Sequence, residues 1–252
     1  MCALNKVLPH GKLEKLFENI WFMKGQVKMS MPPLKISKTM TVIKNPQTND
    51  LTIINAMPLD GKGLEQLKSL GNVKNTLRIG GYHGRDDNFY KEMFGCTVYA
   101  LKGHVYAKDF KDACIETEKG YFQADILLDE QSELPIPNAC LKFIKSSHPV
   151  EAILHINQDN GILITADALH NMPAPDEFVG FGAKLVTKKM GFYKPYNVGP
   201  GWYKFATPSA KEVNSILDWN FEHVLPGHGD PVIGSAKEKY RPVLESLVKN
   251  PS

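Results

Sequence analysis

Three groups of histidine, aspartate and arginine residues stand directly after short apolar runs in this chain of 252 residues. They are Tyr82-His-Gly-Arg-Asp-Asp-Asn88, Ala166-Asp-Ala-Leu-His170 and Pro226-Gly-His-Gly-Asp230. Loops at strand ends are frequent positions for reactive side chains. Imidazole and carboxylate groups together suit zinc, iron or manganese. The three groups therefore predict a metal site assembled from loops that are far apart in the sequence.

The runs that precede these groups have the β-branched, apolar composition of strands. Strands are expected over residues 20–27, 39–43, 51–55, 73–79, 96–101, 152–156, 161–166 and 223–225. Apolar residues at helical spacing predict helices over residues 63–70, 88–94, 208–219 and 236–248. Residues 157–160 have the composition of a hairpin turn. A strand run followed by a helix, twice over, indicates two β-layers with helices outside.

Composition limits the classes of function. The length is compatible with a single domain over residues 1–252. The net charge is only +3, and the longest basic cluster is Lys188-Lys189, so we expect no nucleic-acid partner. We find neither a signal-like apolar start nor an apolar run of 18 residues, which predicts a cytoplasmic protein without a membrane partner. The scattered cysteines are interpreted as free thiols: Cys2, Cys96, Cys114 and Cys140.

At the three polar groups the chain resembles the metallo-β-lactamase-fold superfamily, over roughly residues 16–235. That superfamily carries HxHxDH after a strand, a His before a hairpin, an Asp after the hairpin and a His near the end. His83-Gly-Arg-Asp-Asp-Asn88 falls on the first motif, 162–167 on the Asp strand and 224–229 on the last His segment. The resemblance implies an α+β fold, the four-layer αββα sandwich of the metallo-β-lactamase type.

The segment Ser146-Ser-His-Pro-Val-Glu151 leaves the remaining histidine of the family pattern open. Counting back from Asp167 places His148 at that position. Aligning Pro149 on the family's proline places Ser147 there instead. A slip of one residue at a strand entrance turns a side chain to the other face, so the two alignments differ in whether His148 is a ligand.

The resemblance implies a depleted metal site. The candidate ligands are His83, Asp87, His148, Asp167 and His228. Asp87, Asp167 and His228 would preserve one of the two family metal positions, which is enough for a catalytic ion with an open coordination place. Arg85 stands at a family histidine and cannot ligate a cation, so it would replace a metal electrostatically or bind an anionic group. We expect one divalent metal (zinc first, then iron or manganese) or none.

The leading hypothesis is a metal-dependent hydrolase that acts on a small-molecule substrate, with Asp87 and Arg85 at the reacting centre. The alternative is a metal-free binding or regulatory domain, which the arginine at position 85 favours. A redox protein that uses a pair of metal ions is disfavoured, because both metal positions are short of ligands. Nothing in the sequence supports a β-lactam substrate. Substrate identity and oligomeric state stay open.

Two further segments have alternative interpretations. His170 and Asn171 follow the Asp167 loop and are interpreted as surface residues, although they could line the opening of the predicted metal site. The aromatic segment Gly199-Pro-Gly-Trp202 could contact a substrate or simply cover the core.

Overall fold

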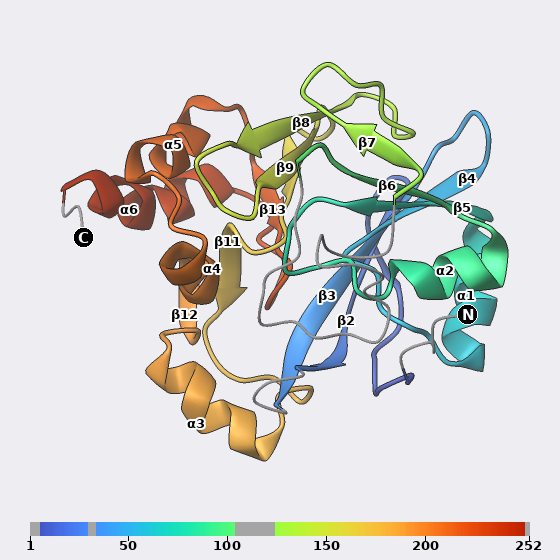
Figure 1. Cartoon of the computed structure of the whole chain (residues 1–252), viewed down its shortest axis with the longest axis horizontal. Helices are drawn as coiled ribbons and strands as arrows, with labels where there is room; N and C mark the ends of the chain where they lie inside the picture. Colours follow the sequence, from blue (N-terminus) through green and yellow to red (C-terminus); the bar gives the residue numbers. More distant parts are fainter. Residues whose placement is uncertain (1–5, 30–33, 104–123, 250–252) are drawn as a thin grey trace.

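A computed structural model describes residues 6–29, 34–103 and 124–249 (Figure 1). Cys2 and Cys114 lie outside these ranges, so their predicted state as free thiols stays a prediction. Cys96 is a buried free thiol and Cys140 a half-buried one.

The first sheet contains seven strands in the order of the sequence, β1-β2-β3-β4-β5-β6-β7. The pairs from β1 to β4 are antiparallel, and the pairs from β4 to β7 are parallel. The parallel pair β4 and β5 is connected by helix α1 (Gly61–Leu70), whose first turn is capped by the Asp60 carboxylate at 2.8 Å from the Gly63 amide. Helix α2 (Asp87–Phe94) follows β5. The strands are β1 (Glu14–Phe17), β2 (Ile20–Lys28), β3 (Lys35–Lys44), β4 (Asp50–Ile54), β5 (Asn72–Arg78), β6 (Thr97–Leu101) and β7 (Ile126–Leu128).

The second sheet has the strand order β13-β10-β9-β8, and a separate pair is formed by β11 and β12. The predicted turn at residues 157–160 joins β9 and β10 in an antiparallel hairpin. The strands are β8 (Ala139–Ile144), β9 (Glu151–Ile156), β10 (Ile162–Ile164), β11 (Leu169–Met172), β12 (Lys194–Val198) and β13 (His223–Leu225). The helices are α3 (Phe181–Lys189), α4 (Pro200–Phe205), α5 (Ala210–Asn214), a 3-10 turn (Ser215–Asp218) and α6 (Ala236–Lys249).

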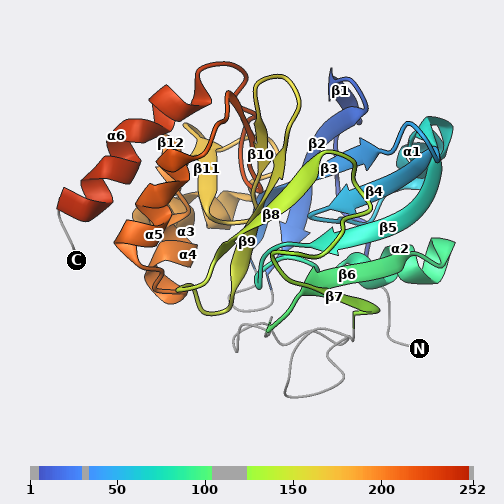
Figure 2. The ribbon, with the colours of Figure 1, turned by 90° about the horizontal axis from the view of Figure 1, so that it is seen from above.

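The two sheets face each other with helices on both outer sides, as Figure 2 shows edge-on. Buried aliphatic residues of both sheets, such as Ile54, Leu77, Leu154 and Ile164, form the central core. A second cluster lies between the first sheet and helices α1 and α2, and a third between the second sheet and α4, α5 and α6. The predicted four-layer αββα sandwich is therefore confirmed.

Several elements differ from the sequence prediction. The helix expected over 208–219 is divided into α5 and a 3-10 turn. Helices α3 and α4 were not expected, and Trp202 of α4 is 3% exposed in the core beneath the helices. The aromatic segment 199–202 thus covers the core. In the part of the chain that the structure describes, no helix is long and apolar enough to cross a bilayer.

Candidate metal centre

Asp167 and His228 follow two neighbouring strands of the second sheet. β10 and β13 pair in parallel, with Ile164 opposite Leu225. The carboxyl ends of parallel strands lie at one edge of a sheet, which is where such folds place their sites. The two loops therefore begin side by side.

His83 approaches the same place from the first sheet, in the turn between β5 and α2. The backbone amide of His83 donates to the Gly80 carbonyl at 3.2 Å. Next to this turn, the Ala152 amide of β9 donates to the Ile79 carbonyl at 2.8 Å and ties the two sheets together. A Cβ at Gly80 would lie 2.6 Å from the Ala166 Cβ, so the close approach of the two loops requires glycine.

The carboxylate of Asp167 lies between two buried imidazoles. Asp167 Oδ2 is 3.3 Å from His83 Nε2, and Asp167 Oδ1 is 3.4 Å from His228 Nε2. One donor atom from each residue lies within 4.8 Å of the others. His83, Asp167 and His228, which the sequence nominated from three separate motifs, thus meet at one point.

The hydrogen bond of His228 to the backbone decides which of its nitrogens carries the proton. His228 Nδ1 lies 2.7 Å from the Ser37 carbonyl oxygen of β3, an acceptor, so Nδ1 is the donor. In the neutral ring, Nε2 then presents its lone pair to Asp167 Oδ1. Two acceptors that face each other at this distance need a cation between them, either a proton or a metal ion.

His170 is a fourth member of the group. It is only 1% exposed, and its Nε2 lies 3.5 Å from Asp167 Oδ1. Its ring is 4.7 Å from that of His228, and neither of its nitrogens has a hydrogen-bond partner among the described residues. The interpretation of His170 as a surface residue is therefore wrong, because β11 turns inward after the Asp167 loop. The spacing Asp167-x-x-His170 was the signal in the sequence.

Glycines permit the dense packing of backbone around Asp167. A Cβ at Gly199 would lie 1.9 Å from the Asp167 carbonyl oxygen, and a Cβ at Gly227 would lie 2.0 Å from the Ala166 carbonyl oxygen. Any side chain at either position would push the loop of Asp167 or of His228 away from the group.

Glu151 anchors the backbone of the Asp167 loop through hydrogen bonds. This glutamate is fully buried at the start of β9, and its Oε1 accepts hydrogen bonds from the amides of Asp167 (2.8 Å) and Ala168 (2.6 Å). Burial and the nearby Asp167 carboxylate raise the pKa of Glu151 well above its ordinary value. The buried glutamate thus supports the backbone of the Asp167 loop.

Burial makes the histidines poor bases. Desolvation lowers the pKa of His83 and the pKa of His170 from 6.5 to about 4. Burial alone would raise the pKa of Asp167, but the surrounding imidazoles hold the pKa of this carboxyl well below its ordinary value. At neutral pH His83 and His170 are therefore neutral imidazoles beside the Asp167 carboxylate, which is the protonation state that metal ligands require.

The residues fit a single divalent ion. Buried atoms without a hydrogen-bond partner in the described structure include His83 Nδ1, Asp167 Oδ2 and both ring nitrogens of His170. A tetrahedral ion with bonds of about 2.0–2.1 Å separates its ligand atoms by about 3.3 Å. His83 Nε2 lies 3.3 Å from Asp167 Oδ2, and His228 Nε2 lies 3.4 Å from Asp167 Oδ1, the other oxygen of the same carboxylate. The Nδ1–H group of His228 donates a hydrogen bond to the Ser37 carbonyl, as the second ring nitrogen of a metal-bound histidine commonly does.

Solved structures resemble this fold, although no known sequence family and no curated protein matches the chain. DIM-1 metallo-β-lactamase is 14% identical with a TM-score of 0.58, covering 96% of this chain and 100% of that one. FIM-1 of Pseudomonas aeruginosa, solved in its mono-zinc form, is 12% identical with a TM-score of 0.56, covering 97% and 99%. A metallo-β-lactamase from Pontibacter korlensis is 12% identical with a TM-score of 0.57, covering 93% and 98%.

The fold is that of the metallo-β-lactamase superfamily. Within this metallo-β-lactamase fold, the remaining predicted site residues lie outside the central group. Asp87 is buried, and its Oδ2 lies 3.0 Å from Arg78 Nε in an ion pair that is shielded from solvent. Burial raises the pKa of Asp87, whereas Arg78 opposes that shift. The carboxylate of Asp87 is thus directed to an arginine of β5.

A second buried cation accompanies this pair in the metallo-β-lactamase fold. Lys38 of β3 donates to the Ala56 carbonyl at 2.7 Å and lies 3.8 Å from the Asp86 carboxylate. Burial lowers the pKa of Lys38. Neither Lys38 nor Arg78 was nominated from the sequence, because both lie within strands, β3 and β5, rather than in the loops that follow strands.

Arg85 and His148 lie at the margin of the site. Arg85 is half-buried, and its Nη1 donates to the Lys28 carbonyl at 2.6 Å. The side chain of His148 is exposed, and its amide donates to the Ala206 carbonyl at 2.9 Å. At the neighbouring position Ser147 is buried, and its hydroxyl bonds the Ile144 carbonyl at 2.9 Å. The structure therefore does not bring His148 into the central group.

Proposed function

We propose that the protein is a metal-dependent hydrolase with one divalent ion, held by His83, Asp167 and His228. The arrangement of Asp167 and His228 supports this most directly, because two acceptors face each other in a buried site. When bound, the ion would supply Lewis-acid chemistry and activate water. Zinc fits the donor set, and iron(II) or manganese fits it as well.

The residues around the ion have separate tasks in this proposal. His170 lies within reach of Asp167 and either donates to it or completes the ligand set. Glu151 fixes the backbone of Asp167 through two amide hydrogen bonds. Arg85, anchored on the Lys28 carbonyl, would bind an anionic group of a small-molecule substrate at the margin of the site.

The proposed number of metal ions, one, depends on the ion pair that Asp87 forms with Arg78. Because the Asp87 carboxylate pairs with Arg78, it is not free to bind a metal ion, and a second ion would lack this carboxylate as a ligand. This is also the observation that favours the rival function, a metal-free binding domain that keeps the fold. The two hypotheses differ in metal content.

Elemental analysis of untagged protein, purified beside an Asp167→Ala variant, tests the proposal. We expect about one equivalent of zinc, iron or manganese in the wild type and its loss in the variant. Far-UV circular dichroism on both proteins shows whether the variant is folded. Less than about a tenth of an equivalent after metal soaking would refute the hydrolase and support the binding domain.

A substrate comparison tests the role of Arg85. Chromogenic esters, thioesters and phosphodiesters are prepared as pairs that differ in one carboxylate. We expect faster hydrolysis of the anionic member, and an Arg85→Met variant should raise KM for that member by about tenfold while leaving the neutral one unchanged. Equal effects on both members would exclude Arg85 from substrate binding.

A further inference from the structure

Most of the surface of helix α3 is exposed to solvent. Of its nine residues only Ala183 and Thr187 are buried, whereas Phe181 is 94% exposed and Leu185 is 63% exposed. Short helices are marginal in water and are normally stabilised by packing an apolar face. This helix instead carries its largest apolar side chains on the face that the protein does not cover.

The two most exposed apolar residues, Phe181 and Leu185, form one stripe on the side of α3 opposite its buried side. At about 100° per residue, Leu185 points away from the direction midway between Ala183 and Thr187. Phe181 lies one turn earlier on the same stripe. The helix therefore has two apolar faces, of which only one is packed against the protein.

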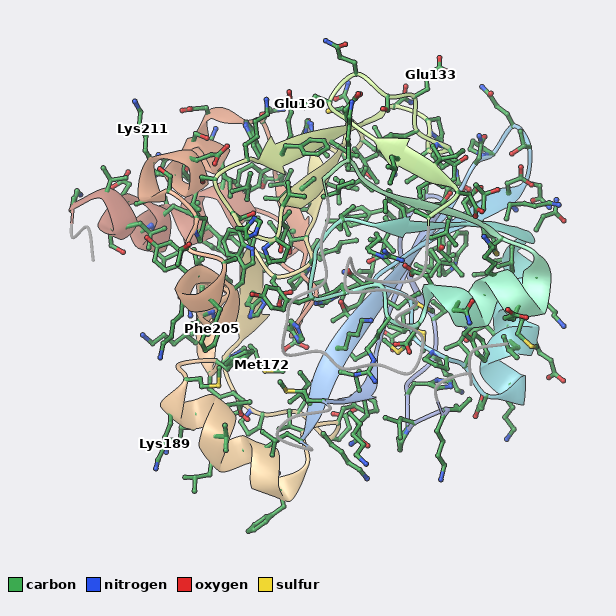
Figure 3. All side chains as sticks on the ribbon, in the orientation of Figure 1. Glu130, Glu133, Met172, Lys189, Phe205 and Lys211 are labelled. Atoms are coloured by element: carbon green, nitrogen blue, oxygen red, sulfur yellow. The ribbon has the colours of Figure 1, made fainter. Side chains whose placement is uncertain are left out.

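Lysines flank the exposed stripe on both sides. By the same helical geometry, Lys184 and Lys188 follow one edge of the stripe and Lys189 the other. The helix contains no acidic residue. Figure 3 shows Lys189 extended away from α3, at the end of the protein that this helix forms in Figure 1. An apolar stripe bordered by lysines on a projecting helix is the arrangement of an interfacial membrane helix.

We infer that α3 docks on an anionic lipid surface, with Phe181 and Leu185 in the interface and Lys184, Lys188 and Lys189 on the headgroups. Lysines near an anionic bilayer are attracted by its negative surface potential. The stripe is convex and projects two side chains, which suits insertion between lipids better than a standard protein interface of about 800 Å² on each partner. Pairing of two copies of this stripe would bring their lysines together, so charge disfavours self-association.

This inference revises the expectation of no membrane partner. That expectation rested on the absence of a spanning run, and an interfacial helix needs no such run. The location of α3 also connects the surface to the candidate site, since Thr187 on its buried side and His228 line the same small cavity. The docked helix would therefore lie beside the metal centre.

Vesicle cosedimentation of the full chain tests the inference. We compare vesicles of phosphatidylcholine alone with vesicles that contain phosphatidylglycerol as about a third of the lipid. We expect binding only to the anionic vesicles, with at least about a fivefold decrease on raising the salt from 0.1 M to 0.5 M. Absence of binding to anionic vesicles at low salt overturns the inference.

Two pairs of variants locate the binding surface. Phe181→Ser with Leu185→Ser is compared with Val248→Ser, an exposed apolar residue of α6. Glutamate at all three α3 lysines is compared with glutamate at Lys62, Lys74 and Lys211, which are exposed elsewhere and change the net charge equally. Each α3 variant should reduce binding by about fivefold or more, and each control should bind as the wild type does.

The same variants distinguish a protein interface. Sedimentation velocity at several concentrations measures the oligomeric state of the wild type and the Phe181→Ser, Leu185→Ser double variant. A monomer in both, together with vesicle binding, supports the lipid surface. Equal vesicle binding by α3 variants and controls overturns it. A dimer that the double variant dissociates, without vesicle binding, would assign the stripe to self-association and also overturn it.

Discussion

The buried carboxyl group of Glu151 bonds the backbone of Asp167 rather than its side chain, with Glu151 Oε1 2.8 Å from the Asp167 amide. The same oxygen lies 2.6 Å from the Ala168 amide. One buried carboxyl group therefore satisfies two buried donors and directs the Asp167 carboxylate toward the histidines. The candidate metal centre rests on a support that lies outside the group of possible ligands.

Replacement of Glu151 by leucine should destabilise the fold. The change leaves the amides of Asp167 and Ala168 buried without an acceptor, and we expect a loss of about 2–4 kcal/mol in the free energy of unfolding. Glu151→Gln keeps one carbonyl oxygen as the acceptor for both amides, so its loss should stay within about 1 kcal/mol. Urea unfolding at pH 7 measures both. Equal losses in the two variants would contradict the role given to the amide hydrogen bonds.

Asp87 and Asp167 should behave differently when each is changed to asparagine. Asp87→Asn removes a charged partner of the buried Arg78, and we expect a loss of about 3–5 kcal/mol in the free energy of unfolding. The affinity for zinc should change little, because Asp87 is directed to Arg78. Asp167→Asn should lower that affinity by at least about tenfold.

Competition with a chromophoric chelator measures zinc affinity, and urea unfolding in excess chelator measures stability. A large loss of affinity in Asp87→Asn, comparable to that in Asp167→Asn, would restore Asp87 as a ligand. It would also mean that the Arg78 pair opens when the ion binds.

His170 and His148 form a second matched comparison. His170→Ala removes a buried imidazole 3.5 Å from Asp167 and should weaken zinc binding by about 10–100-fold. His148→Ala removes an exposed imidazole outside the group and should leave zinc binding unchanged. Isothermal titration calorimetry on the chelator-treated proteins checks both. A loss in His148→Ala alone would favour the alignment that made His148 a ligand.

The sequence predicted the architecture because strand runs and hairpin turns are local signals. Hydrophobic runs such as 152–156 identified β9, and the turn at 157–160 set its pairing with β10. Helix α3 escaped detection for a physical reason. Its apolar residues are divided between a buried and an exposed side, so they do not show the single stripe that marks a packed helix.

The site was only partly accessible to the same reasoning. His83, Asp167 and His228 each follow a strand, and that position was sufficient to nominate them. The partner of Asp87 could not be inferred from the sequence. Arg78 ends β5 and Asp87 begins α2, so the conformation of the turn between them brings the two side chains together, and no regular sequence spacing indicates it. The burial of His170 was predicted wrongly, because it depends on the pairing of β11 with β12, which is distant in the sequence.

The final prediction concerns pH. In the metal-free protein the folded-state pKa values of His83 and His170 are lowered to about 4 by burial, whereas the unfolded imidazoles titrate near 6.5. Between these values the unfolded chain binds more protons, so acid favours unfolding. We expect the free energy of unfolding to fall as pH drops from 6.5 to 4, by up to about 1.4 kcal/mol per pH unit for each histidine.

Urea unfolding in excess chelator at pH 4.5, 5.5, 6.5 and 7.5 measures this slope. The raised pKa of Glu151 acts in the opposite direction, since the unfolded chain loses that proton first as pH rises. A Glu151→Gln background therefore removes this opposing contribution, and a comparison within that background measures the effect of one histidine. In that background His170→Gln should remove about half of the slope, because only His83 then titrates across the interval. An unchanged slope would show that His170 does not enter the fold as a neutral, desolvated imidazole.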